Sequence, residues 1–154
     1  MVLIAGALLV ALSACGDDDG GGNGLSLVEF ERRAAAACER AMEAKAERFP
    51  PEAVGDPEPP PDVLREQAIV EADVVRGYRD DLARLDPPSG LRDEFEEMLK
   101  TLDELAAAYD DAAEAAGTGD VDAARRAYNR AGTLGARANR IFFDHARDAF
   151  CAAV

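Results

Sequence analysis

Few residues in this chain of 154 residues could carry out chemistry. It has one histidine, His145, and three cysteines, which are Cys15, Cys38 and Cys151. One histidine cannot supply the paired Glu-x-x-His motifs of a di-iron bundle, and no Cys-x-x-Cys-His run offers covalent haem attachment. Phosphate-binding glycine loops and the Gly-x-Ser-x-Gly motif are also absent. The sequence therefore predicts a protein that is not an enzyme and has no catalytic residues, metal or cofactor.

Three tyrosines are the best material for a binding site. Tyr78, Tyr109 and Tyr128 occupy apolar positions in three different expected helices, and His145 lies on an apolar stripe of the last one. Together they could line a small cleft for a ligand or a cation. The alternative is packing in the core or at its rim with the hydroxyl groups at water, which is the more frequent use of such residues.

Five arginines of the last expected helix fall within about 100° on a helical wheel. They are Arg126, Arg130, Arg137, Arg140 and Arg147. Such a strip could bind anions such as wall polymers or lipid headgroups. The preceding helix is strongly acidic, so pairing across the hairpin between these two helices is the expected structural use of the charges.

Two of the cysteines form an even pair. Cys38 lies on the apolar stripe of the first expected helix and Cys151 at the end of the fourth, so we expect a disulfide between them in an exported chain. It would also set the stagger of the two helices and place Phe49 near Arg140. A thiol metal site and two free buried thiols are the alternatives.

The amino terminus indicates export. An unbroken apolar run over residues 2–12 is too short to span a bilayer as a helix, which takes about twenty residues, but it suits a signal peptide. The run ends in Leu12-Ser13-Ala14-Cys15, which resembles the lipobox of bacterial lipoproteins. The resemblance implies that residues 1–14 are removed and that Cys15 carries lipid. The alternatives are an ordinary secretory signal with a free Cys15 and a chance apolar start.

The chain from Cys15 onward is expected to have two regions. Residues 15–25 contain the lipidated cysteine and a flexible acidic leash rich in glycine. Residues 26–154 are expected to form one domain, because the larger apolar side chains suffice for only one modest core.

The net charge of −14 argues against nucleic-acid binding, which depends on lysine and arginine.

Apolar spacing predicts four helices, and hence an all-α, antiparallel up-down-up-down four-helix bundle with one disulfide joining the first and last helices. The first covers 26–49, with Ser26 as N-cap, Lys45 at the bundle rim and Phe30 at the edge of the buried stripe. The second covers 62–85 with Asp62 as N-cap, the third 91–116, and the fourth follows Asp120.

Each expected helix has one apolar stripe that we expect to be buried. The first buried stripe comprises Leu27, Ala34, Cys38, Ala41, Met42 and Phe49. The second comprises Val63, Val70, Val74, Tyr78, Leu82 and Leu85. The third comprises Leu91, Phe95, Met98, Leu102, Leu105, Tyr109, Ala112 and Ala116. The fourth comprises Val121, Ala124, Tyr128, Ala131, Gly135, Ala138, Phe142, His145 and Ala149.

The layout as a whole resembles the small, alanine-rich helical lipoproteins of high-GC Gram-positive bacteria. The resemblance rests on the lipobox, a cysteine in the first helix, the Leu85-Asp86-Pro87-Pro88 turn, the Gly117-Thr118-Gly119-Asp120 turn and a late cysteine. It implies a lipid-anchored protein of the cell membrane's extracytoplasmic face, and assigns no activity. We expect a monomeric interaction or structural module with an unknown protein or envelope partner. A small-ligand or cation-binding bundle is the alternative.

Overall fold

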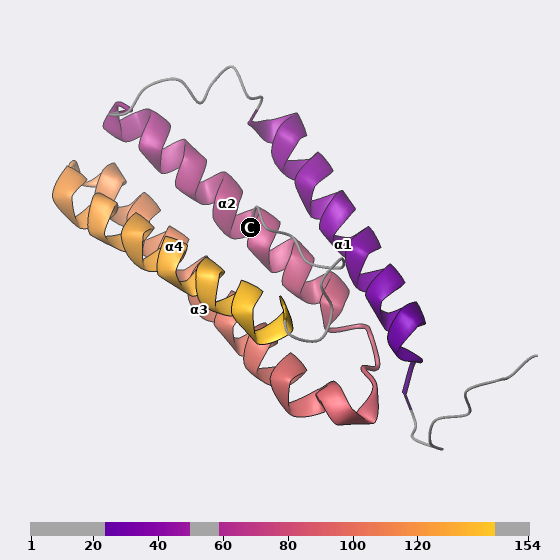
Figure 1. Ribbon diagram of the computed structural model, residues 1–154. Helices are drawn as coiled ribbons and strands as arrows, with labels where there is room; N and C mark the ends of the chain where they lie inside the picture. The colour runs from indigo at the N-terminus through magenta and orange to yellow at the C-terminus, as the bar shows by residue number, and fades with distance from the viewer. Residues whose placement is uncertain (1–23, 50–58, 144–154) are drawn as a thin grey trace, which may run out of the picture.

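The described part of the chain consists of helices and short turns. In the computed structural model this part comprises residues 24–49 and 59–143, and no strand occurs within it (Figure 1). The helices are α1 (Leu27–Arg48), α2 (Pro61–Leu82), α3 (Arg92–Gly117) and α4 (Val121–Phe143), with a 3-10 turn η2 (Ser89–Leu91) before α3. The all-α prediction with four helices is confirmed. The predicted residues outside the described ranges are Cys15, His145, Arg147, Ala149 and Cys151.

The first two helices begin in different ways. Ser26 is the N-cap of α1, as predicted, and its hydroxyl oxygen accepts a hydrogen bond of 3.3 Å from the backbone N–H of Glu29. The prediction of Asp62 as N-cap of α2 is wrong, because the helix already begins at Pro61. Proline suits the first helical position, since its φ is already near the helical value and no partner is needed for a backbone N–H there. Asp62 lies in the first turn instead.

The predicted hairpin joins α3 to α4. Gly119 adopts a φ of 80°, a left-handed conformation that glycine accepts without strain. Asp120 then caps α4, and its side chain accepts a hydrogen bond of 2.9 Å from the backbone N–H of Ala123. The sharp turn brings the acidic α3 against the arginine-rich α4 over most of their length.

Consecutive helices run antiparallel, and α2 lies between α1 and the α3–α4 pair (Figure 1). The main contacts join α1 to α2, α2 to α3 and α3 to α4. In the described residues, α1 and α4 are therefore not the close neighbours that a symmetrical four-helix ring would require. Among the described residues, α1 meets α3 in the shared core, where the rings of Phe30 and Phe95 lie edge to face with centroids 5.3 Å apart.

The predicted seam of α3 is buried throughout, except for the half-buried Tyr109. The predicted stripe of α1 is only partly right. Phe30, expected at its edge, is 0% exposed and lies in the main core, whereas Leu27 and Met42 are exposed. The side chains of α1 that pack inward are those of Phe30, Ala34, Ala37 and Ala41. This face is rotated from the predicted one because a run of alanines gives little contrast between buried and exposed positions.

Burial in the other two helices is mixed. In α2, Val63 of the predicted stripe is half-buried, and Ala68, Ala72 and Val75 are buried in addition to the expected residues. The prediction that this helix extends to Leu85 is wrong, because α2 ends at Leu82 and the half-buried Leu85 lies in the turn that follows. In α4 the small residues of the stripe are buried, while Val121 and Tyr128 are half-buried. These small residues allow α3 and α4 to approach closely.

The predicted stagger between Phe49 and Arg140 is wrong. Phe49 follows the last turn of α1. Arg137, one turn before Arg140, pairs with Glu97 of α3 at 2.8 Å, close to the Phe95 ring that touches Phe30 in the first turn of α1. Arg140 therefore lies near the beginning of α1, and Phe49 lies at its opposite end. The predicted stagger depends on Cys38 lying beside Cys151, which is outside the described residues.

Candidate functional site

One polar cluster combines side chains from all four helices. It consists of Lys45, Glu71, Tyr109 and Tyr128, and we call it the inner polar cluster. Lys45 of α1 pairs with Glu71 of α2, with 2.7 Å between Nζ and Oε1. Tyr109 of α3 and Tyr128 of α4 meet edge to face, with ring centroids 5.5 Å apart. The ion pair thus joins α1 to α2, the two rings join α3 to α4, and the charge of Glu71 acts on both tyrosines.

The carboxylate of Glu71 is the main source of charge acting on the two tyrosines of the cluster. The side chain of Glu71 is only 19% exposed, and its Oε2 is buried without a hydrogen bond from any described residue. Burial, with the negative charge of Glu71 as a second cause, raises the pKa of Tyr109 to about 12. Burial, followed by the same charge, also raises the pKa of Tyr128. Both tyrosines therefore stay neutral at physiological pH and can donate hydrogen bonds.

The raised pKa of Tyr109 predicts a loss of stability in alkali. The tyrosine of the unfolded chain ionises near its ordinary pKa of 10.0, whereas the folded one holds its proton until about 12. Stability is thus fully present below pH 10 and falls as the pH rises towards 12. We expect the thermal midpoint to fall more steeply between pH 9 and pH 11.5 in the wild type than in Tyr109→Phe. Equal slopes would show that Tyr109 titrates normally.

The three predicted cleft tyrosines are in two places. Tyr109 and Tyr128 belong to the inner polar cluster, while Tyr78 is fully buried in the main core beneath a groove between α1 and α2. His145, the fourth predicted lining residue, lies outside the described residues. Of the three tyrosines predicted to line one cleft, Tyr109 and Tyr128 are therefore in contact and Tyr78 is elsewhere. Sequence reasoning placed Lys45 at the rim but gave no sign of its partner, Glu71.

The predicted arginine strip is partly used in ion pairs. Arg130 pairs with Asp111 at 2.6 Å, and Arg137 pairs with Glu97 at 2.8 Å. These contacts confirm the expected pairing of α3 with α4. Arg126 and Arg140 are exposed and make no ion pair to a carboxylate of the described residues, and Arg147 lies outside them.

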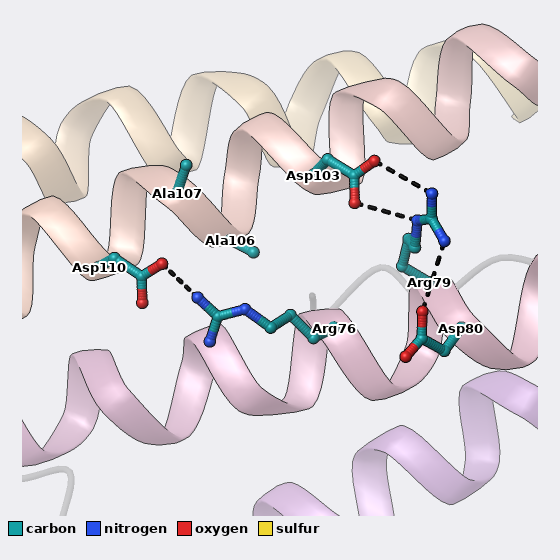
Figure 2. Close-up of a pocket in the computed structure, with 7 residues that line it drawn as sticks. All are labelled: Arg76, Arg79, Asp80, Asp103, Ala106, Ala107 and Asp110. Carbon is teal, nitrogen blue, oxygen red and sulfur yellow. Dashed lines mark hydrogen bonds and ion pairs between the residues drawn. The ribbon is translucent and has the colours of Figure 1, made fainter.

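A second groove lies between α2 and α3 (Figure 2). Its volume is about 280 Å³, and Ala106 forms part of its floor. Arg79 pairs with Asp103 at 3.0 Å, and Arg76 pairs with Asp110. These ion pairs connect α2 and α3 across the groove. Because the charges already neutralise one another, little net charge is left to bind a ligand.

Two grooves border α1, and the first of them is the groove above Tyr78 between α1 and α2. One, of about 260 Å³, has a floor of alanines, Gly77 and Tyr78, with ion pairs Arg40–Asp81 and Arg48–Asp73 along it. The other, of about 670 Å³, lies where Arg48 meets the first turns of α2. Both are open and rimmed by charged groups, unlike the mostly apolar, enclosed pockets that hold small molecules.

The described ranges contain neither a group of metal ligands nor a helix that could cross a membrane. No group of three or more histidine, cysteine or acidic side chains there is arranged to hold a metal ion. None of the helices formed by these residues is long and apolar enough to cross a membrane.

The described residues thus define an all-α protein whose polar groups chiefly connect helices. Comparison with family models, curated proteins and solved structures gives no match.

Proposed function

We propose that this protein is a non-catalytic lipoprotein of the cell envelope, held at the extracytoplasmic face of the cell membrane by lipid on Cys15. The order of its segments carries the proposal. An apolar run ends in Leu12-Ser13-Ala14-Cys15, an acidic glycine-rich leash follows, and α1 begins at Leu27. Two or more acyl chains would give stable attachment, at about 0.8 kcal/mol per buried methylene.

The finer features of the fold are part of the same proposal. A disulfide between Cys38 and Cys151 would tie the last residues of the chain to α1, and the protein would be a monomer. Both features fit the resemblance to small alanine-rich lipoproteins of high-GC Gram-positive bacteria. In that setting the helices form a stable body at the membrane surface and act through an unknown protein or envelope partner.

Helix α1 is the surface best suited to a partner. Among the described residues, the exposed large apolar side chains are Leu27, Val28 and Met42 on α1 and Ile69 on α2. Apolar groups at the surface favour protein contacts over solvent. The arginines of α4, by contrast, are partly occupied by the carboxylates of α3. A partner would therefore approach from the side of α1.

The anchor is tested by Cys15→Ala, with Cys38→Ala as the matched control. In a bacterial host that lipidates exported proteins, we expect the wild type and Cys38→Ala in the membrane fraction and Cys15→Ala in the soluble fraction. Mass spectrometry should find the acyl groups on Cys15. Undiminished membrane retention of Cys15→Ala would overturn the proposal.

The interaction role is tested by a photo-crosslinking residue placed at Met42, with Thr133 on α4 as the control position. We expect one defined crosslinked band from position 42 in cells and none from position 133. No crosslink from position 42, together with a ligand-dependent rise of the thermal midpoint, would favour the alternative function of binding a small ligand or a cation.

A further inference from the structure

The start of α1 lies at one end of the bundle, together with the end of α2 and the start of α3 (Figure 1). Two adjacent residues of its first turn, Leu27 and Val28, are 44% and 74% exposed. They are half of the exposed large apolar side chains in the described residues. Because the side chains of a helix lean towards its amino terminus, both lean towards this end of the molecule.

The turn between α2 and α3 extends this apolar surface. The backbone N–H of Leu25 donates a hydrogen bond of 3.0 Å to the carbonyl oxygen of Asp86, so the residues before α1 lie against this turn. Leu25, Leu85 and Pro88 are only half-buried there. We call the surface formed by Leu25, Leu27, Val28, Leu85 and Pro88 the apolar end.

The position of Gly24 fixes where the preceding chain reaches the bundle. A Cβ atom on Gly24 would lie 2.5 Å from the backbone carbonyl oxygen of Pro87, so the absence of a side chain permits this close approach. Nine peptide units join Cys15 to Gly24 and span at most about 32 Å. Helix α3, with 26 residues, is about 39 Å long. With lipid on Cys15, the apolar end is therefore the end that is held near the bilayer.

The distribution of charge favours the same orientation. Residues 24–33 and 83–91, which form the apolar end and its surroundings, contain three arginines and three carboxylates and are neutral overall. Residues 110–122, around the turn at the opposite end, contain five carboxylates and no lysine or arginine. An anionic lipid surface therefore repels the opposite end and tolerates the apolar one.

We propose that the apolar end lies on the lipid surface, with Leu27 and Val28 inserted among the headgroups and the α3–α4 turn directed away from the membrane. The inference rests on the lipid of the proposed function and adds a second contact with the same membrane. Two apolar side chains bind a bilayer weakly by themselves, but a tether of this length keeps them at a high local concentration beside it. Met42, further along α1, stays available to the proposed protein partner.

The contact is tested with a single tryptophan, since the chain contains none. Val28→Trp places the reporter at the apolar end. The matched control is Ile69→Trp, because Ile69 is 37% exposed and lies thirteen residues before Leu82, about 20 Å further from this end along α2.

The lipidated variants are incorporated into vesicles of phosphatidylcholine with a minor share of phosphatidylglycerol, with or without bromine on the acyl chains. We expect bromine to lower the emission of Val28→Trp at least about two-fold, as for a side chain about 5–10 Å deep, and to leave Ile69→Trp unchanged. Equal quenching of both variants, or no quenching of a membrane-attached Val28→Trp, would overturn the inference and leave the anchor intact.

Two other outcomes would also count against the inference. Emission of Val28→Trp that is insensitive to bromine but shifts to the blue as the protein becomes denser would assign the apolar end to a second copy of the chain. Membrane retention of Cys15→Ala would overturn the lipid anchor itself, and with it the premise of this contact. Fractionation therefore distinguishes a failure of the proposed function from a failure of the proposed orientation.

A charge at Leu27 distinguishes insertion from mere closeness to the bilayer. In the Val28→Trp protein, we expect Leu27→Asp to lower the quenching by bromine at least about two-fold, because a carboxylate is costly to remove from water. An aspartate in the first turn of a helix suits the helix dipole, so α1 should stay folded. Met42→Asp, at a position that is 38% exposed on the same helix, should leave the quenching unchanged. Unchanged quenching in Leu27→Asp would mean that the tether alone brings this end near the lipid, which would contradict insertion.

Discussion

Phe30→Ala is expected to lower the free energy of unfolding by about 3–5 kcal/mol, the usual cost of removing a fully buried phenylalanine. The ring is 0% exposed and contacts Phe95 edge to face at 5.3 Å. The contact joins α1 to α3 in the shared core, and the other buried side chains of α1 are alanines. Its loss therefore removes the largest anchor of this helix.

The effect is measured by urea unfolding followed by circular dichroism. Val28→Ala serves as the control, because Val28 lies on the same turn and is 74% exposed, so its cost should stay below about 0.5 kcal/mol. Hydrogen exchange should show that α1 loses protection in Phe30→Ala before α3 does. A cost below 1 kcal/mol would mean that α1 is held mainly by its contacts with α2.

How far the sequence predicts this fold depends on the contrast between side chains. In α3, leucine, methionine and phenylalanine alternate with charged residues, so Phe95 and Leu102 could be placed in the core from their spacing alone. In α1, four consecutive alanines precede Cys38, and alanine is small enough to fit either face. The position of the stripe then depended on Met42, which is exposed, while Phe30 forms the actual anchor.

Contacts between distant helices were harder to predict than the helices themselves. The opposite charges of α3 and α4 predicted Arg130–Asp111, because a tight turn forces those two helices together. No local pattern connects Lys45 with Glu71, which are separated by a proline-rich connector. The adjacency of α1 and α4 came from assuming a closed ring of helices, and the described contacts place α1 chiefly on α2.

Lys45→Met is expected to destabilise the protein by about 2 kcal/mol. The variant keeps a side chain of similar length but removes the cation that lies 2.7 Å from Glu71. The carboxylate would then remain in a site where one of its oxygens is buried and its negative charge acts on Tyr109 and Tyr128. Removing one partner of a fully buried pair costs about 3–5 kcal/mol, and the 31% exposure of the lysine side chain lowers the expected value.

The double variant Lys45→Met/Glu71→Leu distinguishes the cost of an unpaired charge from the cost of altered packing in the free energy of unfolding. Because replacing both partners by apolar groups avoids an unpaired charge, we expect it to recover at least half of the loss. Arg48→Met is the matched control on the same two helices. Its pair with Asp73 is 2.9 Å long but about half exposed on both sides, so its cost should stay below about 1 kcal/mol. A double variant that is less stable than Lys45→Met would show that Glu71 stabilises the protein without its lysine.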